Sequence, residues 1–431
     1  MSSLAAIAVR RGYRVTGSDR AESEATDKLA KLGIEITYAH NAENVIGADA
    51  VIFTAAVHDD NPEMAKSVEL GIPRIKRAEF LGYIMRDYKT RIGVAGMHGK
   101  STTTSMISEV FIKCGAEPTI VNGVKLAMLD GAYLVGSKEH FIFEACEYTD
   151  SFLSFFPSIA VVLNIDRDHV DYFESMEQTV ESFRKYINLA ENAVVNIDNE
   201  YMADAIKGYC GNLITVGTEG KEAEYKAENI IYKNGCGEFD FMHNSKKLGR
   251  ISLSVPGKHE VLDALVSAAV ADICGLDFEK CAKALYEFKG ANRRFERTGS
   301  FNGIDVYDDY AHHPSEIKTT LEGIVQLGYK KVWCIFQPHT YSRTAGLFDE
   351  FSRAFDEVDT VIFADIYAAR ETDTLGVSSK KLAEAAGEHA LYIDSFEKIA
   401  AYLKENAEPG DLILTMGAGD VYKVGQMLTA Q

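Results

Sequence analysis

The segment of this 431-residue chain best suited to chemistry is a glycine-rich run that ends in a lysine and a hydroxyl, GVAGMHGKSTTTS at residues 93–105. It departs from the common phosphate-binding pattern GxxxxGK[ST] at the first glycine, but Gly96 and Gly99 still precede Lys100 and Ser101. Small residues at a strand-to-helix junction let backbone N–H groups face an anion. Lys100 would then reach nucleotide phosphates and Ser101 would bind Mg²⁺. A strand-to-helix turn with glycine caps is the weaker alternative.

Strands and helices must alternate around this loop to hold it in place. RIGVAG predicts the strand before the loop, and HFIFEACE and IAVVLNID predict further strands of a central parallel sheet. Between about residues 213 and 256 the pattern changes to short segments typical of antiparallel ribbons, and two predicted helices follow. The strand-and-helix rhythm recurs before and after this block, which predicts three α/β domains in series.

Composition and charge limit the partners of the chain. The net charge of -19 argues against a protein that wraps nucleic acid, which needs a basic face. Seven cysteines without a CxxC motif favour reduced thiols over disulfides or a zinc site. Because the chain lacks an apolar run of about 18 residues and a convincing signal peptide, we expect a cytoplasmic protein without membrane insertion.

Eight further motifs make the resemblance to a known family specific. In chain order they are EACEYTDSFL, NIDRDHVDYF, PGKHEVLDAL, RRFE, VYDDYAHHPSEI, FQPHTYSRT, DIYAARE and MGAGDVY. With the glycine-rich loop, they occur in the order shown by the Mur ligases, the ADP-forming amide ligases of peptidoglycan synthesis. The chain resembles this family over essentially its whole length.

The resemblance implies both a fold and an activity. It implies a Rossmann-like substrate domain at residues 1–88, a P-loop ATPase-like domain at 89–296 with a parallel sheet plus a small antiparallel sheet, and a Rossmann-like amino-acid domain at 297–431. DDYAHHP with FQPHTYSRT is most similar to the branch that joins UDP-N-acetylmuramate to L-alanine through an acyl phosphate, with ATP and Mg²⁺ as cofactors. A monomer or a homodimer is expected.

The nucleotide and metal ligands are implied residue by residue. Lys100 and His169 are expected to be catalytic. The metal would be bound by Ser101, Glu144 and His169, with Asn164, Asp168 and, more weakly, Glu147 behind them. ATP would be bound by Gly96, Met97, His98, Gly99, Lys100, Ser101, Thr102, Arg294 and Asp309. Glu260 and Asp263 depart from the asparagines that the family usually shows near adenine.

An amide ligase also needs a cation for the carboxylate of the incoming amino acid. Arg343, just after a predicted strand, offers a planar guanidinium that can bind it in a bidentate manner, and we expect it to be catalytic. By resemblance the neighbouring substrate-binding residues are Tyr310, His312 and His339. DDYAHHP could alternatively form a zinc or acid–base cluster, but adjacent strand residues point to opposite faces and cannot all meet one ion.

The N-terminal end differs from the family. Mur ligases begin with a strand and a glycine-rich turn of the form GxGGxGMS, and residues 1–4 correspond to the end of that turn. The segments that border the same uridine-nucleotide site by resemblance are Gly17, Ser18 and Asp19, with FTAAVHDDNP. We therefore expect a weakened first domain, because a parallel sheet without its central strand leaves backbone groups unpaired.

Two alternatives to the alanine-adding ligase remain open at this point. One is a related ligase that adds a peptide or another amino acid, which FQPHTYSRT argues against. The other is a truncated, non-catalytic nucleotide-binding homologue. Lys100, Glu144, His169 and Arg343 argue against that one, because they retain chemistry at four separate positions.

Overall fold

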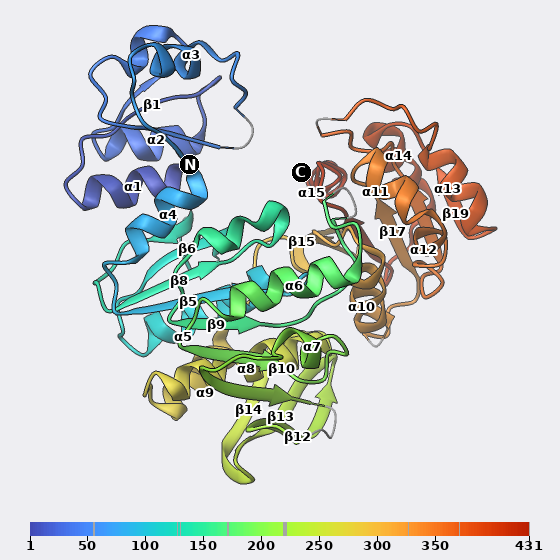
Figure 1. The fold of residues 1–431 in the computed structure, drawn as a ribbon. Coiled ribbons are helices and arrows are strands. Elements are labelled where there is room, and N and C mark those ends of the chain that lie inside the picture. The colour runs from blue at the N-terminus through green and yellow to red at the C-terminus, as the bar shows by residue number, and fades with distance from the viewer. Residues whose placement is uncertain are drawn as a thin grey trace.

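The computed structural model describes residues 1–54, 57–126, 128–129, 131–169, 172–218, 222–325, 327–369 and 371–430. Two residues of the predicted FTAAVHDDNP segment, 55 and 56, lie outside these ranges. Figure 1 shows three α/β units along the chain, the first blue, the second cyan to yellow and the third orange to red. The predicted three-domain α/β class is confirmed, while the boundaries at 88/89 and 296/297 stay predictions.

The first unit contains two separate pairs of parallel strands. β1 (Thr16–Ser18) pairs with β2 (Glu35–Thr37), and β3 (Val51–Phe53) pairs with β4 (Arg74–Lys76). Among the described residues no ladder joins the two pairs, so the expected single Rossmann-like sheet is divided. The helical segments of the unit are α1 (Ser2–Arg10), α2 (Glu24–Lys31), η1 (Ala42–Val45), α3 (Pro62–Glu69) and α4 (Arg77–Met85).

Two helices of the first unit share their core with the second unit. A single cluster of buried apolar side chains contains Leu4, Ile7, Leu81, Ile84 and Met85 of α1 and α4 together with Phe141 and Phe143 of β8 (His140–Glu144). Tyr88, which follows α4, packs edge-on against Phe141 with ring centroids 4.7 Å apart. The hydrophobic effect therefore attaches α1 and α4 to the central sheet.

The central unit is built on one ten-stranded sheet in the order β14-β13-β12-β11-β10-β9-β5-β8-β6-β7. Besides β8, its strands are β5 (Thr90–Ala95), β6 (Thr119–Leu126), β7 (Gly131–Leu134), β9 (Ile159–Val162), β10 (Asn192–Asn196), β11 (Asn212–Gly217), β12 (Tyr225–Lys233), β13 (Cys236–His243) and β14 (Lys246–Pro256). β5 lies between β8 and β9 and is almost wholly buried, as its apolar sequence predicts.

The predicted antiparallel ribbons are present, but they do not form a separate small sheet. β12, β13 and β14 pair antiparallel with one another, and β12 continues the large sheet by pairing parallel with β11. That connection involves only Val216 with Tyr225 and Gly217 with Lys226. The alternating apolar and polar residues predict the antiparallel strands. They do not predict the join between β11 and β12, because two residue pairs are too few to leave a recognisable pattern.

Helices cover both faces of the central sheet. One face packs against α5 (Lys100–Lys113), α8 (His259–Ile273) and α9 (Phe278–Glu287). The other packs against α4, α6 (Met176–Ile187), α7 (Met202–Ala205) and the turn η2 (Tyr148–Ser154). On this second face the Tyr186 hydroxyl donates a 2.9 Å hydrogen bond to the Gly93 carbonyl, which satisfies a buried polar group of β5. β5 leads into the glycine-rich loop at residues 96–99, called the nucleotide loop below.

The third unit has a six-stranded sheet in the order β15-β16-β20-β17-β18-β19. The strands are β15 (Glu296–Phe301), β16 (Ile304–Asp309), β17 (Val332–Phe336), β18 (Thr360–Phe363), β19 (Ala390–Tyr392) and β20 (Leu412–Met416). The helices are α10 (Pro314–Val325), α11 (Tyr341–Gly346), α12 (Phe348–Ser352), α13 (Ser379–Ala386), α14 (Phe396–Asn406) and α15 (Tyr422–Thr429). All strands except β15 run parallel, so the ends of β16 and β17 open on the same edge.

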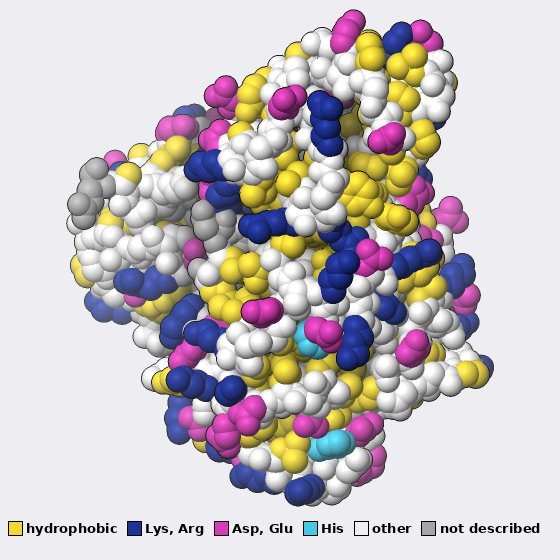
Figure 2. All heavy atoms as spheres, turned by 90° about the vertical axis from the view of Figure 1, so that its left-hand side faces the viewer, with side chains coloured by type: hydrophobic (Ala, Val, Ile, Leu, Met, Phe, Trp, Pro, Cys, Tyr) yellow, Lys and Arg dark blue, Asp and Glu magenta, His cyan; other side chains and the backbone are white. Residues whose placement is uncertain are grey.

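The surface carries both acidic and basic side chains. On the face drawn in Figure 2, acidic and basic side chains lie side by side with apolar atoms between them. Among the helices that the structure describes, none has the length and apolarity needed to cross a bilayer.

We expect the strand pairs of the first unit to exchange their amide hydrogens earlier than α4 and β5. Each pair is only three residues per strand, whereas α4 is backed by the core that it shares with β8. Hydrogen–deuterium exchange followed by mass spectrometry on the full chain measures this directly. Equal protection of residues 16–76 and 77–95 would contradict it.

Candidate functional site

The nucleotide loop connects the buried strand β5 to the helix α5. Gly99 caps α5 with a left-handed backbone (φ 82°), a conformation that costs glycine little. A side chain here would also be crowded, because a Cβ would lie 3.1 Å from Asp263 Oδ1. The loop can therefore keep its shape only with glycine at this position.

The start of α5 presents unpaired donors. The backbone N–H groups of residues 99–102 have no hydrogen-bond acceptor among the described residues, as expected for a first helical turn. Asn164 holds the loop from behind: it accepts from the His98 N–H at 2.9 Å and donates to the His98 carbonyl at 3.0 Å. A helix start with free N–H groups has the geometry that can bind an anion such as phosphate.

Lys100 lies over this turn and is held by Glu147. Its Nζ lies 3.0 Å from Glu147 Oε2 and donates to the Met97 carbonyl at 3.1 Å. Burial opposes the charge, but Glu147 raises the pKa of Lys100 above its usual value. Glu147 Oε1 also lies 3.0 Å from His169 Nε2, so the buried carboxylate connects two predicted catalytic residues. A fixed cation at this point can neutralise phosphate charge.

Ser101 and Glu144 meet at the end of β8. The Ser101 hydroxyl donates a 2.8 Å hydrogen bond to Glu144 Oε2, which also accepts from the Gly123 N–H at 3.1 Å. A hydroxyl and a carboxylate oxygen are ligands that Mg²⁺ prefers, so these two residues fit the predicted ion. The third predicted ligand, His169, contacts Glu147 instead.

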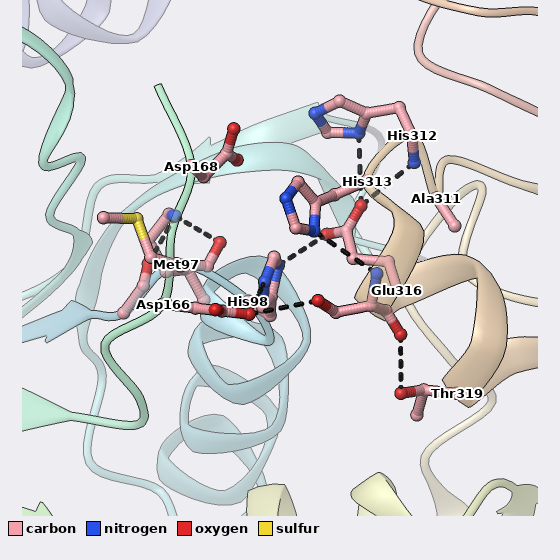
Figure 3. Close-up of polar contacts among 12 residues, drawn as sticks. Met97, His98, Asp166, Asp168, Ala311, His312, His313, Glu316 and Thr319 are labelled. Carbon is pink, nitrogen blue, oxygen red and sulfur yellow. Dashed lines mark hydrogen bonds and ion pairs between the residues drawn. The ribbon is translucent and has the colours of Figure 1, made fainter. Parts of the chain in front are cut away.

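One half-buried imidazole, that of His98, joins the central and third units. His98 Nε2 lies 3.3 Å from Asp166 Oδ2, and its Nδ1 lies 3.3 Å from Glu316 Oε1 on α10 (Figure 3). Burial opposes protonation, but the two carboxylates raise the pKa of His98 to about 9. Hydrogen bonding to His98 in turn lowers the pKa of Asp166 to about 2. At neutral pH His98 is therefore an imidazolium between two carboxylates.

His313 completes this junction from the third unit. Its Nε2 lies 3.0 Å from the Arg167 carbonyl, and its Nδ1 accepts from the Ser315 N–H at 3.3 Å. Within the described part of the chain, His98, Asp166 and His313 place potential metal-ligand atoms within 4.8 Å of one another. Because both ring nitrogens of each histidine already face protein partners, the arrangement holds the two units together without an ion.

Arg343 reaches the central unit from the start of α11. Its Nε and Nη2 lie 3.3 and 3.2 Å from Asp168 Oδ1, and its Nη1 donates to the His339 carbonyl at 3.2 Å. Burial acts to raise the pKa of Asp168, but the Arg343 guanidinium and nearby imidazoles hold it well below its usual value. A guanidinium fixed beside the residue that precedes His169 can bind a second carboxylate.

The aromatic residues predicted for the substrate pocket gather around Arg343. The rings of His312 and His339 lie 6.0 Å apart, and those of Tyr310 and His312 lie 5.4 Å apart. Burial lowers the pKa of His312 to about 4, so its imidazole is neutral near pH 7 and adds no charge beside Arg343. Glu371 fixes the start of α11 by accepting from the Ser342 N–H at 2.9 Å and the Thr340 hydroxyl at 2.8 Å.

A cavity of about 370 Å³ adjoins the loop between the central and third units. Gly99 and Thr102 line it on the loop side, and Arg294 and Asp309 line it on the side of the third unit. Asp309 accepts backbone N–H groups from Phe295 and Ala311, each at 2.7 Å. Burial raises the pKa of Asp309 to about 6, although Arg294 acts against this. Five of the residues predicted to bind ATP therefore line one cavity: His98, Gly99, Thr102, Arg294 and Asp309. Gly96, Met97, Lys100 and Ser101 do not line it, and the binding roles stay predictions.

The predicted residues form two groups in space. The loop, Glu144, His169, Arg294, Asp309 and the pocket around Arg343 lie along the junction of the central and third units. Gly17, Ser18 and Asp19 lie in the first unit, where the Ser18 hydroxyl donates to Glu63 Oε2 at 2.9 Å and the Asp19 N–H donates to the Thr37 carbonyl at 3.0 Å. Their binding roles stay predictions.

Two residues important to the geometry were underestimated from the sequence. Glu316, four residues after His312 at the start of a helix, has the i,i+4 spacing that could have indicated it. Glu147, a weak candidate in the sequence, is the buried partner of both Lys100 and His169. Its position after a buried strand was the only signal.

Models of one protein family match most of the chain. Family models match residues 1–89 ("Mur ligase family, catalytic domain"), 94–271 ("Mur ligase middle domain") and 293–419 ("Mur ligase, glutamate ligase domain").

Curated relatives match at full length. A UDP-N-acetylmuramate–L-alanine ligase from Caldanaerobacter subterraneus subsp. tengcongensis is 47% identical over 99% of this chain and 94% of its own length. Another of the same name from Acetivibrio thermocellus is 48% identical over 99% of this chain and 92% of its own length. The crystal structure of the UDP-N-acetylmuramate-alanine ligase from Thermotoga maritima is 28% identical, with a TM-score of 0.83 over 99% of this chain and 95% of its own.

The His98 junction predicts a pH dependence. Because its pKa rises from 6.5 to about 9 in the folded state, its stabilising contribution is complete below pH 6.5 and is lost as the pH rises through about 9. We expect His98→Gln to lose less thermal stability than the unchanged protein between about pH 7 and pH 9.5. His58→Gln, at an exposed histidine, is the matched control. If the melting temperatures of all three proteins fall by the same amount over this pH range, the prediction is wrong.

Proposed function

Because the chain belongs to the Mur ligase family, we propose that it joins UDP-N-acetylmuramate to L-alanine in an ATP-dependent ligation that releases ADP and phosphate. The observation that carries this proposal is the identity of 47% to the Caldanaerobacter ligase over 99% of the chain. The reaction forms an amide bond for peptidoglycan synthesis. We further propose a cytoplasmic protein that is a monomer or a homodimer.

In the first half of the reaction the substrate carboxylate attacks the γ-phosphate of ATP, the bond to the β-phosphate oxygen breaks, and an acyl phosphate forms as ADP leaves. The N–H groups at the start of α5 and the Lys100 ammonium would bind the transferred phosphoryl group. Such groups act through positioning and charge neutralisation. Glu147 would orient Lys100, which otherwise has many rotamers.

Mg²⁺ is proposed as the cofactor. Ser101 and Glu144 would hold it, with His169 as a further ligand once released from Glu147. When bound, the ion would neutralise phosphate charge beside the loop.

In the second half the amine of L-alanine attacks the acyl phosphate and phosphate leaves. Arg343 would bind the alanine carboxylate, with Tyr310, His312 and His339 forming the surrounding pocket. Contacts of His98 and Arg343 with carboxylates across the junction would keep water away from the reactive intermediate. Gly17, Ser18 and Asp19 are proposed to border the uridine nucleotide.

The proposal is tested by phosphate release with ATP, Mg²⁺ and UDP-N-acetylmuramate. The amino component is L-alanine, glycine, L-serine, D-glutamate or an L-alanyl tripeptide in parallel reactions. Turnover restricted to L-alanine is the expected result. Turnover with the tripeptide or D-glutamate would instead favour another ligase of the family, and bound ADP without any turnover would favour a non-catalytic homologue.

Replacing Lys100 tests the phosphate-binding role. Lys100→Ala removes the cation beside the transferred phosphoryl group, and we expect phosphate release to fall about 1000-fold or more with the fold unchanged. Lys138→Ala, at an exposed lysine, should match the unchanged protein in the same assay. A well-folded Lys100→Ala protein with near-normal turnover would defeat the assignment.

Replacing Arg343 tests the amino-acid pocket. Arg343→Lys keeps the charge but loses the planar pair of donors, so the KM for L-alanine should rise about 10- to 100-fold. The KM for ATP should change little, because Arg343 lies outside the nucleotide cavity. Steady-state kinetics with Arg353→Lys, an exposed arginine, as control would show the difference. An unchanged KM for L-alanine refutes the role.

A further inference from the structure

One carboxylate on α10 contacts both halves of the predicted active site. Glu316 lies in the first turn of α10, and its side chain is only 10% exposed. A glutamate at such a position can reach back to the backbone ahead of its helix, and Glu316 Oε2 accepts the His312 N–H at 3.0 Å. Figure 3 shows this carboxylate between His98 and His312, which belong to different units of the protein.

The first oxygen of Glu316 faces the nucleotide side. His98 Nδ1 lies 3.3 Å from Glu316 Oε1, and Arg294 Nη1 lies 3.7 Å from it. His98, Arg294 and Glu316 all line the nucleotide cavity. The separation of 3.7 Å is longer than a hydrogen bond, so Glu316 holds the Arg294 guanidinium only loosely. A ligand in the cavity therefore lies beside two of the partners of Glu316.

The second oxygen faces the predicted amino-acid pocket. Besides accepting the backbone N–H of His312, Glu316 Oε2 lies 3.3 Å from His312 Nδ1. The His312 ring lies 6.0 Å from that of His339 in the pocket around Arg343, and His312 does not line the nucleotide cavity. Glu316 thus fixes both the backbone and the ring of a residue that lies beyond the nucleotide cavity.

The two oxygens belong to one planar group and cannot move independently. A phosphate would attract the Arg294 guanidinium away from Glu316, because it offers charge-assisted hydrogen bonds that the 3.7 Å contact lacks. Fewer cations would then share the negative charge of Glu316, which strengthens its hydrogen bond with the His312 N–H. Contiguous contacts of this kind can transmit a change at one site to another.

We propose that Glu316 is a positioning residue that couples nucleotide binding to the amino-acid pocket: a bound nucleotide draws Arg294 away, and Glu316 then holds His312 more firmly in place. This inference rests on the proposed function in taking an adenine nucleotide and an amino acid as the two ligands. Coupling of this kind is reciprocal, so each ligand strengthens the binding of the other by the same factor.

The first test follows His312 directly. Protein labelled with ¹⁵N-histidine contains 11 histidines, and a His312→Gln variant identifies the backbone amide signal of His312. Saturating ADP with Mg²⁺ should move this NMR signal in the unchanged protein. The signal should stay in place in Glu316→Gln, which keeps the shape of the side chain but removes its charge. Glu322→Gln, at an exposed glutamate of α10 outside the cavity, should behave like the unchanged protein.

The second test measures the coupling itself. Isothermal titration calorimetry should give a Kd for L-alanine about fivefold or more lower with saturating ADP than without it. In Glu316→Gln the two Kd values should be the same, whereas a merely destabilised protein would keep their ratio. If melting curves show that Glu316→Gln does not fold, Glu316→Asp takes its place in both tests. It keeps the charge but is too short to reach both sides, so it should also lose the coupling.

Two results would overturn the proposal. One is a His312 signal that does not respond to ADP in the unchanged protein, or that moves equally in the Glu316 variant. The other is an effect of ADP on the Kd for L-alanine that is equal in both proteins. Both tests are read without turnover, so a protein that shows the coupling but forms no amide contradicts the proposed function alone. If ADP moves the His312 signal but L-alanine does not bind, the proposed amino acid is wrong and the role of Glu316 stands.

Discussion

The junction between the central and third units depends on the positive charge of the His98 imidazole. His98 lies in the nucleotide loop, and its protonated ring is held between Asp166 of the central unit and Glu316 of the third unit. The same loop residue is fixed through its backbone by Asn164. His98 thus links the two: its backbone belongs to the loop that would bind phosphate, and its ring contacts the third unit through Glu316. The ring can serve both carboxylates only while both nitrogens carry protons.

Charge is distributed unevenly along the nucleotide site. Lys100 and the amides at the start of α5 form a positive end, where phosphate charge would develop. Carboxylates dominate the other end, at Glu260, Asp263 and Asp309. An anionic ligand entering this junction can be stabilised in only one orientation, with its charged groups on the loop.

Local pattern predicted much of this arrangement, because the loop, the strands on either side of it and the helices α8 and α9 depend on neighbouring residues. The pairing of Lys100 with Glu147 and of Arg343 with Asp168 could not be predicted in this way. Those partners are brought together by the packing of sheets and units, which leaves no local signal. The same holds for the join between β11 and β12, where two residue pairs unite what the sequence presents as separate sheets.

The apolar cluster that α4 shares with the central sheet determines where the chain can be cut near residue 88. Sequence divides the chain there, but Leu81, Ile84 and Met85 are buried in the same cluster as Phe141 and Phe143 of the central sheet. A truncated protein starting at residue 89 would lose the Tyr88 ring that packs on Phe141 and the α4 side chains of this cluster, and apolar surface exposed in this way promotes aggregation. A soluble fragment designed to retain the nucleotide loop must therefore begin ahead of α4.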